Sequence, residues 1–309
     1  MKTFQSFDGA TISYHDEGEG FPVILMHGYG VDSLGQFGSF ERILSVLEAM
    51  QKLFIETFGG APPMPDPPAE GRAGIIPPLL AAKARVILPD LRGFGASAKS
   101  RETRFYSDWA MARDVVALVE HLRLDAVDLV GFSMGAGTAA RVAILGPPQV
   151  KSAILAGIGD YVIEGTVLVF PKNWPVPEHL PKPLTHKIWA EEGARVLEKN
   201  ELVPGNLGSA HVIASRVTGA DPKVLAAVIR GAVADQMTPE QLNKIHVPIL
   251  VLNGKGDVAN QKTARLLKEI STASFADCEG DHHSTPYQPS FHQAVVEFLE
   301  RQWRERAAS

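Results

Sequence analysis

The sequence is poor in cysteine: its 309 residues include one, Cys278. A single cysteine cannot form a disulfide within the chain, and it supplies no thiolate cluster for zinc or an iron–sulfur centre. Residues 1–14 also lack the apolar run of about 7–15 residues that a secretory signal peptide requires. Both absences favour a reducing compartment, so we expect a cytoplasmic protein.

Long apolar stretches are missing as well. The most apolar segment, residues 153–170, is interrupted by Asp160 and Glu164, so it is a poor candidate for a membrane span. A basic stripe is also lacking, because 30 Lys and Arg are mixed along the chain with 35 Asp and Glu, for a formal net charge of −5. Neither a membrane nor a nucleic acid is therefore an expected partner.

What the chain does have is a large apolar fraction, 45% of its residues, which is enough core for one large domain or for a domain with a smaller one attached. Short apolar runs alternate with segments in which apolar residues repeat at helical spacing. This alternation predicts an α/β fold, with a mostly parallel sheet covered by helices on both faces. The expected strands are residues 3–7, 11–15, 23–26, 85–88, 127–130, 152–155 and 249–252.

Helical spacing is clearest in residues 40–54, 109–122 and 134–145, and in the final segment 291–303. The turn-forming residues 7–10 lie between the first two expected strands. They predict a hairpin, which adds an antiparallel edge to the sheet.

Two segments interrupt the alternation. Residues 59–78 contain five prolines between Pro62 and Pro68, and we expect an irregular insertion there, either a surface loop or a flap near a pocket mouth. Residues 159–237 begin with a proline-rich stretch and continue with helical patterns at 188–199 and 222–234. We expect this segment to form a small, mostly helical cap over a core domain made of residues 1–158 and 238–309.

The most informative stretch is Gly131-Phe132-Ser133-Met134-Gly135, which places a serine between two glycines. An apolar strand candidate precedes it and a helical pattern follows it. This context predicts a sharp strand-to-helix turn that lifts the Ser133 hydroxyl out of the sheet, with glycines where side chains would collide. Without that context the pattern is weak, because a surface turn loosened by glycine would also match it.

A serine nucleophile needs a base within hydrogen-bond reach and a third group that orients the base. Asp257 follows an expected strand, and His282 lies in a loop before the final helix. His283 is an alternative base, and Asp160 is an alternative carboxylate. The Asp281–His283 cluster has no third ligand at metal-binding spacing, so no metal is expected.

The chain order serine, aspartate, histidine, taken with the glycine-flanked serine, resembles the α/β-hydrolase superfamily. Two further segments, His27-Gly28-Tyr29-Gly30 and Asp90-Leu91-Arg92-Gly93-Phe94-Gly95-Ala96-Ser97, each follow an expected strand and strengthen the resemblance, which spans nearly the whole chain. The resemblance implies an α/β-hydrolase fold with a cap. It also implies that Ser133 is the nucleophile, His282 the general base and acid, and Asp257 the carboxylate that orients the ring.

By the same resemblance, the backbone N–H groups of Tyr29 and Met134 would form an oxyanion hole. Met134 opens a helix, where its N–H has no partner within the helix and lies at the positive end of the helix dipole. His27 is expected to be a structural anchor of its loop. Aromatic residues of the cap segment are candidates to line an apolar pocket or to pack the cap on the core: Tyr161, Phe170, Trp174 and Trp189.

These features predict a cofactor-independent serine hydrolase, and in particular a carboxylesterase that cleaves a small to medium apolar ester through an acyl-enzyme. A carbon–carbon bond hydrolase, a lactonase and a cofactor-free haloperoxidase would use the same three residues. A haloalkane dehalogenase is disfavoured, because that group carries an aspartate where Ser133 stands. The alternative that is not an enzyme is a ligand receptor of the same fold, with little turnover of the ligand that it binds.

Overall fold

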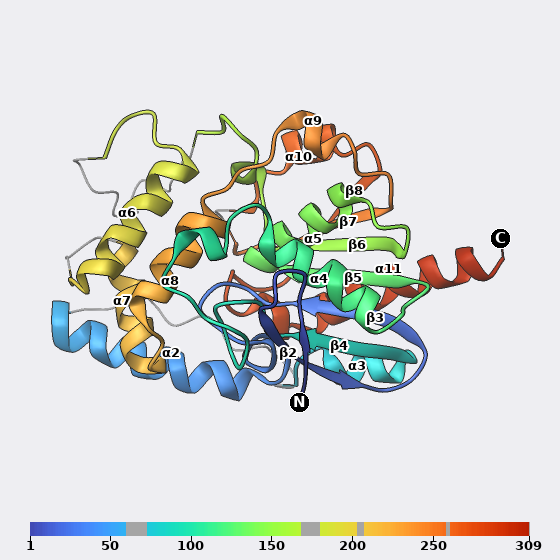
Figure 1. Cartoon of the computed structure of the whole chain (residues 1–309), viewed down its shortest axis with the longest axis horizontal. Helices are drawn as coiled ribbons and strands as arrows, with labels where there is room; N and C mark the ends of the chain where they lie inside the picture. The colour runs from blue at the N-terminus through green and yellow to red at the C-terminus, as the bar shows by residue number, and fades with distance from the viewer. Residues whose placement is uncertain (60–72, 168–179, 203–206, 258–259, 309) are drawn as a thin grey trace.

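The computed structural model describes residues 1–59, 73–167, 180–202, 207–257 and 260–308 (Figure 1). Within these ranges the centre of the molecule is an eight-stranded sheet in the order β1-β2-β4-β3-β5-β6-β7-β8. The strands are β1 (Lys2–Gln5), β2 (Thr11–Glu17), β3 (Phe21–Met26), β4 (Ala84–Pro89), β5 (Val127–Phe132), β6 (Val150–Ala156), β7 (Ile249–Gly254) and β8 (Ala273–Cys278).

The sheet is mostly parallel, as the alternation of strands and helices predicts. From β4 to β8 every neighbouring pair is parallel, whereas β2 runs antiparallel to both β1 and β4. The hairpin is confirmed by its register, which places Phe4 opposite Ile12. β8 was not expected, because it is an edge strand whose residues are mostly exposed or half-buried and so form no apolar run.

Successive residues of each buried strand contribute to different layers of the core, because side chains alternate across a sheet. In β3, Ile24 and Met26 pack with α4 (Ala110–His121) and α5 (Met134–Leu145), whereas Val23 and Leu25 pack with α3 (Ile76–Ala81) and α11 (Pro289–Ala307). Helices therefore cover both faces. α10 (Ala264–Glu269) joins the layer of α4 and α5 through Leu266.

Among the described residues between β6 and β7 are the helices that we call the cap helices: α6 (His186–Lys199), α7 (Leu207–Thr218) and α8 (Pro222–Val228). A π-helical turn, η3 (Ile229–Val233), extends α8, and the short helix α9 (Pro239–Leu242) precedes β7. Figure 1 shows the cap helices gathered at one end of the molecule, beside α2 (Phe40–Phe58). α6 and α8 match expected helical patterns and α7 does not; the division into core and cap domains stays a prediction.

The expectation of a wholly irregular segment at residues 59–78 is wrong at its C-terminal end. α3 begins at Ile76 with two prolines in its first turn, where a missing N–H breaks no helical hydrogen bond. Residues 60–72 lie outside the described part of the chain, as do Phe170 and Trp174 of the cap segment.

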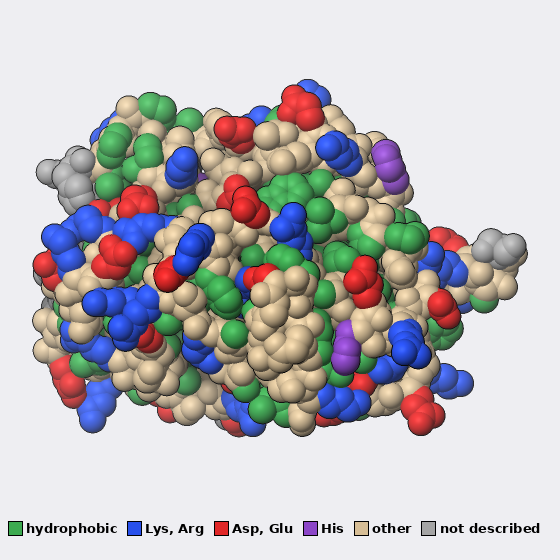
Figure 2. All heavy atoms as spheres, viewed as in Figure 1, with side chains coloured by type: hydrophobic (Ala, Val, Ile, Leu, Met, Phe, Trp, Pro, Cys, Tyr) green, Lys and Arg blue, Asp and Glu red, His purple; other side chains and the backbone are tan. Residues whose placement is uncertain are grey.

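On the face drawn in Figure 2, basic and acidic side chains are interspersed, as the mixed charges of the sequence predict. In the described ranges, no helix has both the length and the apolar character needed to cross a bilayer.

Candidate active site

Ser133 sits in a strained turn between β5 and α5. Its φ of 55° and ψ of −116° lie outside the common regions for residues other than glycine, and its N–H is held by the carbonyl of Ala156 at 2.8 Å. A methyl group at Gly131 would overlap the carbonyl of Gly135, and one at Gly135 would overlap the carbonyl of Met26. The two glycines are thus required because β5, α5 and β3 approach one another closely here.

The ring of His282 bridges the other two residues. Its Nε2 lies 3.0 Å from Ser133 Oγ, and its Nδ1 lies 2.7 Å from Asp257 Oδ2. A carboxylate can only accept, so Nδ1 carries the ring proton and Nε2 is left to accept from the serine hydroxyl. Asp257 is buried and His282 is half-buried. The carboxylate is therefore shielded from water, whereas part of the imidazole ring is accessible to solvent.

Asn260 is a further member of this cluster. Its Nδ2 lies 2.8 Å from each carboxylate oxygen of Asp257 and 3.1 Å from His282 Nδ1. Because Nδ1 already donates its proton to Asp257, the amide donates to the carboxylate and not to the ring. Asn260 therefore fixes the orientation of the carboxylate that faces His282.

The electrostatics of the pair favour the charged forms. Burial raises the pKa of Asp257, but the neighbouring His282 ring and the Asn260 amide outweigh it, and the pKa lies below its ordinary value. Burial lowers the pKa of His282, but the Asp257 carboxylate outweighs it, and the pKa lies above 6.5. The carboxylate thus stabilises an imidazolium, which makes His282 a stronger base toward Ser133.

A family model for the alpha/beta hydrolase fold matches residues 53–181. An esterase from Exiguobacterium antarcticum has a TM-score of 0.61 at 20% identity, with 97% of both chains covered. The chain has the α/β-hydrolase fold. Solved structures of a bromoperoxidase from Bacillus anthracis and an enol-lactonase from Burkholderia xenovorans share the fold, with TM-scores of 0.60 and 0.59 at 22% and 16% identity; each covers at least 97% of both chains.

Two curated relatives cover different shares of the chain. A 2-hydroxymuconate semialdehyde hydrolase from Pseudomonas sp. (strain CF600) is 27% identical over 168 residues, which are 53% of this chain and 47% of that protein. A 2-hydroxy-6-oxo-6-(2'-aminophenyl)hexa-2,4-dienoic acid hydrolase from Metapseudomonas resinovorans is 26% identical over 265 residues, 83% of this chain and 75% of that protein. The chain thus spans about half the length of the first relative.

Two N–H groups beside Ser133 are candidates to bind an oxyanion. Among the described residues, neither the Met134 N–H nor the Tyr29 N–H has a hydrogen-bond acceptor. The Tyr29 loop is held in place by Gln36, whose Oε1 accepts from the N–H of Gly28 at 3.1 Å. Tyr29 itself donates its hydroxyl to the carbonyl of Leu225 on α8 at 3.1 Å, which ties this loop to a cap helix.

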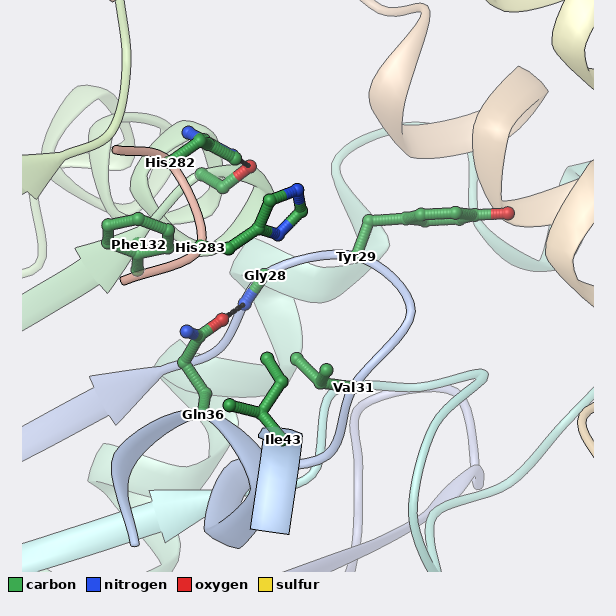
Figure 3. Close-up of a pocket in the computed structure, with 9 residues that line it drawn as sticks. Gly28, Tyr29, Val31, Gln36, Ile43, Phe132, His282 and His283 are labelled. Atoms are coloured by element: carbon green, nitrogen blue, oxygen red, sulfur yellow. Dashed lines mark hydrogen bonds between the residues drawn. The ribbon is translucent and has the colours of Figure 1, made fainter. Parts of the chain in front are cut away.

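The pocket in front of Ser133 is small, with a volume of about 70 Å³. Figure 3 shows His283 and Tyr29 on one side of it and the apolar side chains of Val31 and Ile43 on another. The Tyr29 ring points away from Ile43, toward the cap helices. The remaining lining residues are Gly28, Gln36, Phe132, Ser133 and His282.

The two alternative residues, His283 and Asp160, do not make the contacts of His282 and Asp257. His283 lines the pocket, but it is His282 that contacts Ser133. Asp160 accepts from the N–H groups of Arg265 and Leu266 at the start of α10, whereas Asp257 contacts the ring. His27 anchors its loop as expected, because Nδ1 donates to the carbonyl of Gly28 and Nε2 accepts from the N–H of Leu91.

The hydrolase family segment at residues 90–97 contributes to this anchoring. The Asp90 carboxylate accepts from Ser33, from Ser13 and from the N–H of Ala96. Of the cap-segment aromatics, Tyr161 and Trp189 pack against the core and against His186. Asn260 and Gln36 were not predicted from the sequence, because neither amide stands at a spacing that distinguishes it. Gln36 lies in the short helix α1 (Ser33–Phe37), and the only signal for Asn260 is its place three residues after Asp257.

Proposed function

We propose that this α/β hydrolase is a cofactor-independent serine hydrolase, specifically a carboxylesterase that cleaves a small to medium apolar ester through an acyl-enzyme. One observation carries the proposal: a single imidazole lies 3.0 Å from the Ser133 hydroxyl and 2.7 Å from the Asp257 carboxylate. This is the geometry that makes a serine hydroxyl nucleophilic. The substrate is a small molecule, in keeping with the small pocket.

The acylation step follows from the hydrogen bonds. Ser133 Oγ attacks the ester carbonyl carbon while His282 Nε2 takes the hydroxyl proton, and the carbonyl oxygen becomes an oxyanion. The Tyr29 and Met134 N–H groups donate to that oxyanion, and Asp257 stabilises the imidazolium. When the tetrahedral intermediate collapses, the bond to the leaving oxygen breaks, and His282 returns the proton to it, so the alcohol departs.

Water then releases the acyl group by the same route. His282 takes a proton from the water, whose oxygen attacks the acyl carbon, and the collapse of the second intermediate returns the proton to Ser133 Oγ. The products are an acid and an alcohol, and the enzyme is regenerated. Loss of one oxyanion donor in such a site costs about 10²–10³ in rate.

The roles are tested with a fluorophosphonate probe, which bonds to activated serines. We expect the wild-type protein to be labelled at Ser133, and the S133A variant to be unlabelled and to hydrolyse aryl esters no faster than buffer. The control is S45A, which removes an exposed hydroxyl on α2 and should leave labelling unchanged. Labelling or hydrolysis that survives S133A would remove Ser133 from the mechanism.

A second candidate is carbon–carbon bond hydrolysis. It is favoured by the two curated relatives, whose names describe hydrolases of a semialdehyde and of an oxo-dienoic acid. Aryl esters, lactones and vinylogous diketones assayed side by side distinguish the two functions. Turnover of the esters at the highest kcat/KM supports the esterase; turnover of the diketones with none of the esters supports the alternative.

A further inference from the structure

The side chain of Tyr29 joins a loop of the pocket to the cap helices. Tyr29 lies between β3 and α1, and its hydroxyl donates to the carbonyl of Leu225 on α8 at 3.1 Å. The same carbonyl accepts from the N–H of Ile229, where α8 ends and the π-helical turn η3 begins. A carbonyl oxygen has two lone pairs, so the Tyr29 hydroxyl binds the second one, in the last turn of a cap helix.

Two further rings hold the ring of Tyr29. Its centroid lies 5.8 Å from that of Phe94, in the segment 90–97 of the core, and 5.1 Å from that of His211 on α7. Both contacts are edge-to-face, which is a favourable arrangement of aromatic rings. Figure 3 shows the hydroxyl end of Tyr29 directed away from the pocket, toward the cap helices. A shift of α7 or α8 would therefore move the Tyr29 ring.

The same residue carries one of the two candidate oxyanion donors. The Tyr29 N–H belongs to the peptide group between Gly28 and Tyr29, and the carbonyl of that group accepts from Nδ1 of the fully buried His27 at 2.7 Å. A peptide group is rigid, so the direction of its N–H depends on this carbonyl and on the position of the Tyr29 Cα. Gly30, the next residue, has a φ of 85° and no side chain to restrain the loop. The core thus fixes the carbonyl end of the peptide group, and the Tyr29 ring fixes the other end.

We propose that Tyr29 is a positioning residue, whose side chain, held by α7 and α8, fixes the direction of its own N–H in the oxyanion hole. The cap helices thereby act on the reaction, although Ser133, Asp257 and His282 all lie outside them. This inference rests on the proposed function, because it concerns the oxyanion that forms in acylation. A displaced donor stabilises that oxyanion less, and a misplacement of about 1 Å can cost as much as about 10² in rate.

The test compares a ligand that forms an oxyanion with one that cannot. With trifluoromethyl n-butyl ketone, Ser133 Oγ adds reversibly to the carbonyl carbon, the hydroxyl proton passes to His282 and the carbonyl oxygen becomes the oxyanion. The corresponding secondary alcohol has no carbonyl to attack, and calorimetry gives both Kd values. We expect the wild-type protein to bind the ketone at least about a hundredfold more tightly, as is usual for analogues of a transition state.

Y29F removes the hydroxyl and keeps the ring between Phe94 and His211. We expect it to reduce the ratio of the two Kd values about tenfold, and to lower kcat for an aryl ester by a similar factor at little-changed KM. This is less than the loss of about 10²–10³ that follows removal of an oxyanion donor, because the N–H is displaced and not removed. The control is Y106F, which removes a hydroxyl that donates to the carbonyl of Ser100 at 2.9 Å and should keep the wild-type ratio.

If Y29F does not fold, H211L provides the same test, because it removes the contact of α7 with the Tyr29 ring, and a fall in the ratio is again expected. A wild-type ratio in both variants, an equal fall in Y106F, or an equal weakening of ketone and alcohol binding in Y29F would overturn the positioning role. The proposed function fails separately. A wild-type protein that the fluorophosphonate does not label, and that binds ketone and alcohol equally, lacks the serine hydrolase and the positioning role with it. A labelled protein whose ratio Y29F leaves unchanged lacks the positioning role alone.

Discussion

The basicity of His282 is raised mainly by the Asp257 carboxylate, which holds the pKa of the ring above 6.5 in spite of burial. Acylation requires the neutral ring, so kcat/KM for an ester should fall as the pH decreases through that raised pKa. We therefore expect an acid limb with its midpoint above pH 6.5. A wild-type midpoint at or below this value would show that the carboxylate does not control the ring.

The D257N variant tests the cause of the shift. Removal of the negative charge leaves burial as the main influence on the ring, so the midpoint of the acid limb should move to lower pH. The rate should fall by about 10⁴, as it does when the same substitution is made in a Ser-His-Asp protease, because the amide favours the wrong ring tautomer. An NMR titration of the His282 ring gives the pKa even where the rate is too low to measure.

Asn260 acts on the reaction through Asp257, so it is a positioning residue. N260A removes an amide that lies 2.8 Å from both carboxylate oxygens. Hydrogen bonds to charged groups contribute about 1.5–3 kcal/mol, so the free energy of unfolding should decrease by about that amount. The acid limb should also move and kcat should fall at little-changed KM. A loss of stability with an unaltered pH profile would mean that Asn260 only supports the loop.

The turn between β5 and α5 depends on the close approach of three elements at Gly135. In G135A the added methyl group would overlap the Met26 carbonyl, so α5 must move away from β3. Such overpacking costs about 1–3 kcal/mol, and the displacement carries Ser133 and Met134 with it. We expect thermal unfolding at lower temperature and a loss of ester hydrolysis of more than a hundredfold. G193A in α6 is the matched control, since its new methyl group has room; equal effects of the two substitutions would contradict the argument.

Elements with a strong apolar pattern were predictable from the sequence. β5 is buried throughout, and α5 has the bounds that the helical pattern indicates. β8 and α7 were not predictable, since β8 is a half-exposed edge and α7 combines small, polar and β-branched residues that weaken a helical pattern.

The candidate site is assembled by the order of the strands in the sheet. Ser133, Asp257 and His282 follow β5, β7 and β8, which belong to one parallel run whose carboxyl ends meet at the same edge. The sequence predicts which strand or helix each of these three loops adjoins. It does not predict the order of the strands in the sheet, which decides whether the loops meet. Without β8, the sequence alone could not place His282 beside Ser133.

The whole molecule is held together in part by a buried cation, Arg92, at a junction of segments that are distant in the sequence. Arg92 is fully buried; its Nε and Nη2 each lie 2.6 Å from the carboxylate of Asp114 on α4, and Nη1 lies 2.9 Å from Asp8 in the β1–β2 turn. D114A would leave the guanidinium in the core without its main partner. We expect the free energy of unfolding, measured in urea, to decrease by about 3–5 kcal/mol.

The matched control is D8A, which removes the more exposed partner of the same cation. About a third of the Asp8 side chain is accessible to water, compared with 3% of the Asp114 side chain, so D8A should cost about 1 kcal/mol or less. The hydrogen bonds of Arg92 go to Asp114, Asp8 and the carbonyl of Phe105, and none goes to Ser133, Asp257 or His282. The folded fraction of D114A should therefore keep the acid limb of the wild-type protein. Equal losses of stability in D8A and D114A would show that burial does not set the strength of this junction.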